Sequence, residues 1–116
     1  MSDTVSIELE GKTFELKPTL GALEALSKKY ENFQSVYTRL GSMNLEVYTD
    51  VVYAGVKGKL PPNDKERQET NAEIYNAGII TLMPSLIEFM GLLLNGGKRP
   101  TEEDNQEADE KGEGKP

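Results

Sequence analysis

The chain of 116 residues contains no cysteine, no histidine and no tryptophan. Without cysteine it cannot form a disulfide scaffold or a thiolate metal site. Without histidine it lacks the usual general base near neutral pH, so its serines have no imidazole to activate them. Gly55, Gly58 and Lys59 lack the spacing and the Ser or Thr of a phosphate-binding loop. We therefore expect a protein that is not an enzyme and holds no cofactor and no metal.

Basic residues are also scarce, with 13 Lys and Arg against 20 Asp and Glu and a formal net charge of −7. Nucleic-acid binding and adsorption to an anionic membrane both need a basic footprint, so we expect neither partner. The N-terminus, "MSDTVSIELEG", has no basic segment followed by an apolar run, and is not a signal peptide. We expect a cytoplasmic protein.

The sequence has one long hydrophobic run, "LMPSLIEFMGLLLNGG", at residues 82–97. From Leu82 to Leu94 it is too short to span a membrane, which needs about 20 residues. It also contains Pro84 and Glu88, and we interpret Glu88 as the outward edge of an apolar helix. The run is therefore either a buried core helix or a surface for another protein.

Residues 5–17 alternate apolar and polar side chains and predict a β-hairpin. A two-residue loop at Gly11 and Lys12, in a type II′ turn, would place Leu9 opposite Phe14. An isolated hairpin is marginal in water, so we expect this one to lie on the helices that come after it.

Four helices are expected after the hairpin, before the apolar run. The first opens at Thr19; its expected apolar stripe is Leu20, Leu23, Leu26 and Tyr30. Asn32 caps a second helix that ends at Gly41 in the left-handed conformation, and Asn44 caps a third through Val56. Residues 47–56 are rich in β-branched and aromatic side chains, so a strand remains an alternative there.

Asn63 caps a fourth helix, and Pro84 favours a new, last helix over residues 83–95. The predicted fold class is mainly α with a small N-terminal β-hairpin (α+β), a compact bundle of about four to five short helices. Residues 1–97 form the single domain. The tail, residues 98–116, is acidic and expected to be disordered, because residues 101–116 carry seven acids and no large apolar side chain.

The last helix has two apolar stripes, about 100° apart, where a helix packed on one side needs only one. The first stripe is Leu82, Leu86, Phe89 and Leu93, and the second is Met83, Ile87, Met90 and Leu94. Either both stripes are core, or one is offered to other chains. Methionine suits a surface that accommodates varied partners.

The order of these elements resembles the tail assembly chaperones of long-tailed bacteriophages and prophages, most closely the tail assembly proteins of gene transfer agents. The resemblance covers about residues 5–97. The matching residues are Gly11, Lys12, Pro18, Leu20, Gly21, Ala22 and Leu23, then Val52, Tyr53 and Gly55.

The resemblance implies a non-enzymatic, mostly helical chaperone that binds and solubilises the tape measure protein and helps recruit tail tube protein subunits. It implies a host-cytoplasmic protein absent from the mature virion. We expect the client surface to combine the two stripes of the last helix with Tyr48, Tyr53 and Tyr75. The alternative is a small homo-oligomeric prophage or bacterial adaptor module that associates through the last helix.

Overall fold

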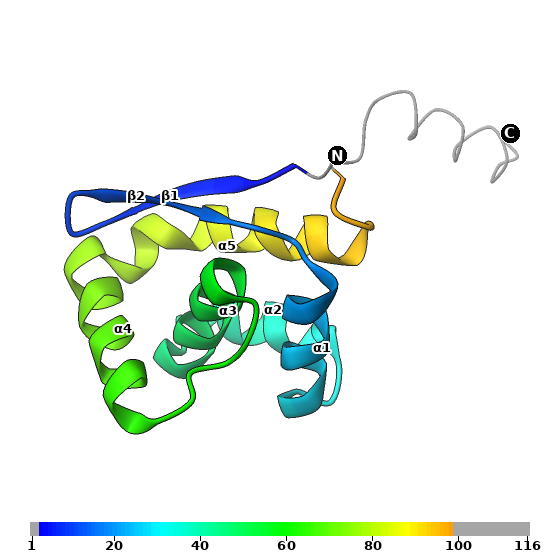
Figure 1. Cartoon of the computed structure of the whole chain (residues 1–116), viewed down its shortest axis with the longest axis horizontal. Coiled ribbons are helices and arrows are strands. Elements are labelled where there is room, and N and C mark those ends of the chain that lie inside the picture. The colour runs from blue at the N-terminus through cyan, green and yellow to red at the C-terminus, as the bar shows by residue number, and fades with distance from the viewer. Residues whose placement is uncertain (1–2, 99–116) are drawn as a thin grey trace, which may run out of the picture.

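The computed structural model describes residues 3–98. An antiparallel hairpin of β1 (Val5–Leu9) and β2 (Lys12–Leu16) precedes five helices. These are α1 (Leu20–Lys29), α2 (Phe33–Gly41), α3 (Leu45–Lys57), α4 (Asp64–Ala77) and α5 (Ile79–Leu94). The hairpin lies across α5, α3 occupies the centre, and α4 stands on the opposite side from α1 and α2 (Figure 1). The predicted fold class is confirmed. Beyond Lys98, the predicted disordered tail lies outside the described residues.

The hairpin has the predicted strands but a different loop. Glu10 and Gly11 form the turn with φ of 52° and 80°, and Leu9 faces Lys12. The predicted loop at Gly11 and Lys12 is therefore wrong. Two positive φ values make a type I′ turn, whose twist matches that of the strands. The observed register also places Val5 opposite Leu16, whereas the predicted one would have paired it with Pro18, which has no backbone N–H to donate. A shift of two residues keeps every apolar side chain on the same face.

The predicted helix starts at the four caps are confirmed. In each case the cap side chain accepts a hydrogen bond from the backbone N–H three residues later. The capping residues are Thr19, Asn32, Asn44 and Asn63. The end of α2 differs from the prediction, because Gly41 is helical and the left-handed residue is Met43, with φ 60°.

Residues 47–56 form a helix, which settles the alternative of a strand. Every residue from 47 to 55 in α3 is buried, so the β-branched and aromatic side chains reflect burial on all sides. Gly55 allows β2 to approach closely: a Cβ there would lie 2.8 Å from Leu16 Cδ2, and Lys17 N donates to the Gly55 carbonyl at 2.9 Å. The hairpin is therefore fixed onto α3.

The last helix begins earlier than predicted. The helix is interrupted at Gly78, whose φ is 97°, and the chain direction bends by 111° between α4 and α5. Pro84 lies in the second turn of α5, so the prediction of a new helix near Met83 is wrong. Pro84 leaves the Ile80 carbonyl without its helical donor, and Ile80 is exposed, so water can satisfy that carbonyl.

The first helix buries fewer residues than its predicted stripe. Ala22 and Leu26 are buried in α1, and Tyr30 is buried at its C-cap. Leu23 is half-buried, whereas Leu20 is 68% exposed. The difference arises because Leu20 is the first residue of the helix and lies at the edge of the domain.

Candidate interaction surfaces

The first predicted stripe of α5 faces the core. The buried side chains are Leu82, Leu86, Phe89 and Leu93, together with Met90 and Leu92. They pack against β1 and all four other helices. A client cannot reach these residues in this structure, so they hold the domain together. Met83 is half-buried against the same cluster.

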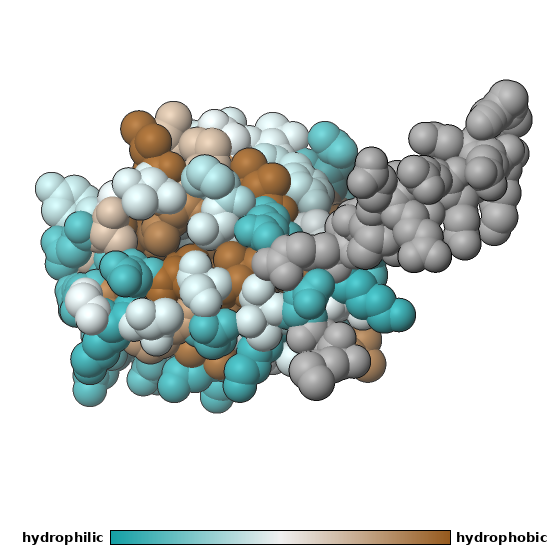
Figure 2. All heavy atoms as spheres, turned by 90° about the horizontal axis from the view of Figure 1, so that it is seen from above, coloured by the Kyte–Doolittle hydropathy of each residue, from teal (hydrophilic) through white to brown (hydrophobic). Residues whose placement is uncertain are grey.

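The outward face of α5 carries a continuous apolar strip. Ile80, Ile87 and Leu94 are 70%, 39% and 47% exposed and recur every seven residues. Pro84 and Gly91 lie between them on the same face. We call these five residues the α5 strip; it contains no charge and is about 21 Å long at 1.5 Å per residue. Figure 2 shows apolar side chains gathered among polar ones on the face that includes the hairpin and α5.

A seven-residue repeat is the spacing with which two helices pack along each other. A Cβ on Gly91 would meet no atom within 4 Å, so a partner backbone has room to approach there. Glu88 is exposed beside the strip, as its interpretation as an outward edge predicts. The strip therefore offers a seam for a second helix.

The three predicted client-binding tyrosines lie in different environments. Tyr48 is fully buried and donates to the Leu40 carbonyl at 2.6 Å. Tyr53 is buried between α3 and α4 and donates to Glu66 Oε1 at 3.1 Å. Tyr75 is 77% exposed on α4. Of the three, only Tyr75 is accessible to a partner without rearrangement.

A buried carboxylate joins α1, α3 and α4. Asp50 is completely buried; its Oδ2 accepts from Tyr30 at 2.5 Å and lies 2.9 Å from Lys29 Nζ, and its Oδ1 accepts from Arg67 Nη2 at 2.8 Å. Burial and the neighbouring Asp50 raise the pKa of Tyr30 above its usual range. Lys29 also contacts Glu46 at 2.5 Å. Because every donor comes from a different element or cap, the cluster ties the helices together.

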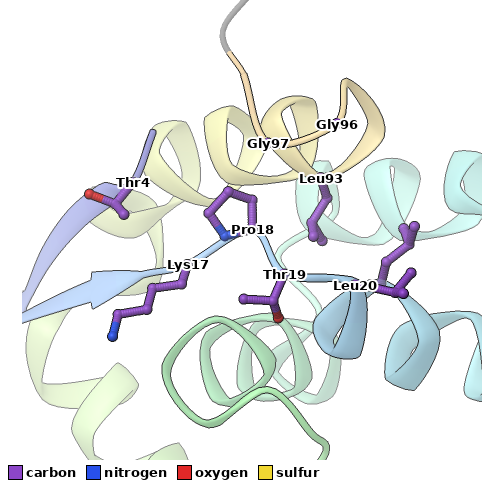
Figure 3. A pocket seen from close by; sticks show the side chains of 9 residues that line it. Thr4, Lys17, Pro18, Thr19, Leu20, Leu93, Gly96 and Gly97 are labelled. Carbon is purple, nitrogen blue, oxygen red and sulfur yellow. The ribbon is translucent and has the colours of Figure 1, made fainter. Parts of the chain in front are cut away.

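A cavity of about 580 Å³ lies where β2 passes into α1 beside the end of α5. Figure 3 shows Thr4 and Lys17 at one end of it and Leu20 at the other, with Leu93 and Pro18 between them. Among residues 3–98, Lys17 is the one ionisable side chain in its lining.

The second cavity, about 180 Å³, lies between the hairpin, α3 and α4. Four apolar side chains form its floor, with Leu9 and Val52 buried and Phe14 and Val56 half-buried; Thr70 and Lys57 also line the cavity. Three glutamates of α4 border it; they are Glu66, Glu69 and Glu73. We call this cavity the acid-rimmed groove.

The carboxylates on one side of the acid-rimmed groove repel one another. Burial raises the pKa of Glu73, and the nearby carboxylates of Glu10 and Glu69 raise it further, while Lys12 lowers it. None of Glu10, Glu66, Glu69 and Glu73 lies within 4.0 Å of a Lys or Arg nitrogen of the described residues. The groove therefore presents carboxylates that have no ion-pair partner in residues 3–98.

Residues 3–98 contain no group of three or more His, Cys, Asp or Glu side chains placed to hold a metal ion. No single described helix is long and apolar enough to cross a membrane. Taken together, α4 and α5 have the length and apolar composition that a bent membrane crossing would need.

Comparisons with family models, with curated proteins and with solved structures found no match to this chain.

Three features of these surfaces are not recovered by sequence reasoning. Ile80 falls in the preceding helix when Pro84 is taken to mark a later start. Asp50 resembles an ordinary polar residue within an apolar helix. Glu69 and Glu73 resemble a solvated face, and their spacing alone does not show that the hairpin packs beside them. A seven-residue search backwards from Leu94 through the predicted Ile87 would have found Ile80.

Proposed function

We propose that this protein is a non-enzymatic chaperone of phage tail assembly that binds and solubilises the helical tape measure protein through the α5 strip. One observation carries the proposal: Ile80, Ile87 and Leu94 form an uncharged, exposed seam at heptad spacing. A tape measure protein is a long chain of amphipathic helix, which docks through apolar residues at similar intervals. In this role the protein works in the host cytoplasm, recruits tail tube subunits and is absent from the mature virion.

The physical size of the strip fits a weak site repeated along one client. Three apolar side chains over about 21 Å bury less surface than a stable pairwise interface needs. Many copies bound side by side along one long helix would together shield its apolar surface, although each copy binds weakly. The net charge of −7 would keep such an assembly soluble. Met83, half-buried on α5, and Tyr75, exposed on α4, would add secondary contacts to the client.

The experiment is co-expression of the full chain with a long helical tape measure protein from the same genome, the client that the proposal requires, followed by measurement of the soluble client. Ile80→Asp combined with Ile87→Asp should return the client to the insoluble fraction. The matched control is Met43→Asp, because Met43 is 44% exposed in the turn between α2 and α3 and its φ of 60° suits Asp. Each variant is checked for helix content before use.

The same strip can pair with a second copy, as the adaptor alternative requires. Light scattering decides between them. A closed small oligomer that Ile87→Asp converts to monomer, with no effect on the client, would replace the chaperone proposal by the adaptor. Equal client solubility with the strip variant and with Met43→Asp would remove the strip from client binding.

A further inference from the structure

The acid-rimmed groove is a second surface, separate from the α5 strip. It lies between β2, α3 and α4, whereas the strip faces outward from α5. Its volume of about 180 Å³ is below the roughly 300 Å³ at which small-molecule sites begin. It therefore suits one side chain of a larger partner.

The floor of the groove determines what that side chain is. Leu9, Phe14, Val52 and Val56 offer carbon surface. Tyr53 also lines the groove, and its hydroxyl already donates to Glu66. A polar group pressed against these four side chains would lose its hydrogen bonds to water without replacing them there, which is unfavourable. The side chain that fits is aliphatic or aromatic.

The rim determines what surrounds that side chain. Glu66, Glu69 and Glu73 stand three and four residues apart, on one face of α4. Glu10 approaches the end of the same helix, where its Oε2 accepts from Asn76 Nδ2 at 3.0 Å. Lys12 and Lys57 lie nearby, so carboxylates outnumber ammonium groups four to two. Arg67, the one arginine of α4, is directed to Asp50 and does not neutralise the rim.

We propose that the acid-rimmed groove binds a lysine- or arginine-containing segment of another protein that inserts one large apolar side chain between β2, α3 and α4. Charge complementarity argues for this occupant: cationic side chains would pair with Glu69 and Glu73, which have no ion pair in residues 3–98. The apolar floor would hold the large apolar side chain of that segment.

The test uses short synthetic peptides with lysines on both sides of a single phenylalanine and alanine elsewhere, titrated into the full chain by calorimetry. A matched peptide has alanine in place of the phenylalanine. We expect the phenylalanine peptide to bind at least about tenfold more tightly. Glu69→Gln with Glu73→Gln should weaken it by a similar factor, and added salt should weaken it further. Amide chemical shifts by NMR should move at Phe14, Val56 and Glu73.

The matched control is Glu24→Gln with Glu31→Gln, which removes the same charge at α1 and just beyond it. Equal affinity for the two peptides would mean that the phenylalanine is not bound in the groove and that the peptides are attracted only by the overall acidic charge. This result would overturn the proposal. Equal weakening by both double variants would do the same. Shifts confined to residues 99–116, whose composition is acidic, would place binding outside the groove. Absence of binding at millimolar peptide also overturns it. None of these outcomes depends on the α5 strip, so they leave the proposed function separately testable.

Discussion

The inward and outward faces of α4 and α5 are built from similar residue types but differ in how completely those residues are partnered. On α5, Leu86 faces inward and is fully buried, while its neighbour Ile87 faces outward and is 39% exposed. On α4, Arg67 reaches inward to a buried carboxylate, while Glu69 and Glu73 border a groove without an ion-pair partner in residues 3–98.

Most inward-facing groups find partners within the fold and therefore contribute to stability; among the described residues, Arg67 Nη1 is a buried polar atom left without a hydrogen bond. The outward faces keep an apolar strip that remains partly exposed and a set of carboxylates that have no ion pair in residues 3–98. An exposed apolar strip and a group of carboxylates without ion pairs are unfavourable in the isolated domain, and we therefore expect each of them to bind a partner. Substitutions that separate the two faces test this view, and their expected effects run from loss of folding to a few tenths of a kcal/mol.

The largest effect is expected from charging the inward face of α5. Leu86→Asp removes a buried side chain, at about 2–5 kcal/mol, and adds the unfavourable burial of a carboxylate. A domain of this size has about 5–15 kcal/mol of stability, so we expect it to be largely unfolded. Far-ultraviolet circular dichroism with urea titration measures this.

Ile87→Asp is the control one position along, and should lower the free energy of unfolding by only about 1–2 kcal/mol, because Ile87 is 39% exposed and loses only part of its burial together with some helix propensity. Similar losses from Leu86→Asp and Ile87→Asp would mean that the two faces contribute equally to stability.

The next effect concerns the buried carboxylate. Asp50→Ala leaves Lys29 and Arg67 without their shared acceptor and the Tyr30 hydroxyl buried without one. Breaking a fully buried ion pair costs about 3–5 kcal/mol, and the partial exposure of both cations reduces this to about 2–3 kcal/mol. Thermal unfolding should shift down by roughly 10 °C or more.

Glu46→Ala provides the comparison, because Glu46 pairs with the same Lys29 but its side chain is 56% exposed. Its loss should be about 0.5 kcal/mol or less. An Asp50→Ala protein as stable as Glu46→Ala would show that Asp50 does not tie the helices together.

The inward faces were more predictable from sequence than the outward ones, for a physical reason. Leu86 and Phe89 follow helical periodicity, and the Asn32 and Asn63 caps are local signals, so both could be found without the tertiary structure. The start of α5 was missed because Pro84 is a strong local signal that tertiary packing overrides.

The hairpin register and the groove depend on contacts between distant segments. A shift by two residues preserves the alternating pattern, so sequence alone could not distinguish a loop at Glu10 and Gly11 from one placed a residue later. The carboxylates of α4 likewise become a rim only when Phe14 is brought beside them.

A moderate gain in stability is expected from Pro84→Ala on the outward face of α5. Alanine restores an N–H to the Ile80 carbonyl and removes the proline ring from the second helical turn. The gain is partly offset by greater freedom of the unfolded chain, leaving about 1–2 kcal/mol. Urea titration measures it, with Ser85→Ala as the neighbouring control. A loss of stability instead would mean that the proline ring packs against the domain.

The smallest effect should come from Glu73→Gln, and its pH dependence identifies it. The raised pKa means that the folded state disfavours the ionised carboxylate, so the unfavourable contribution is present at neutral pH and absent below the unfolded pKa of about 4.3. Glu73→Gln should therefore stabilise the protein slightly at pH 7, by about 0.5 kcal/mol or less, with the gain disappearing on acidification. Urea titrations at several pH values, compared with Glu24→Gln, measure the difference. A gain that grew as the pH fell would contradict repulsion at the groove, because protonation of Glu73 can only relieve it.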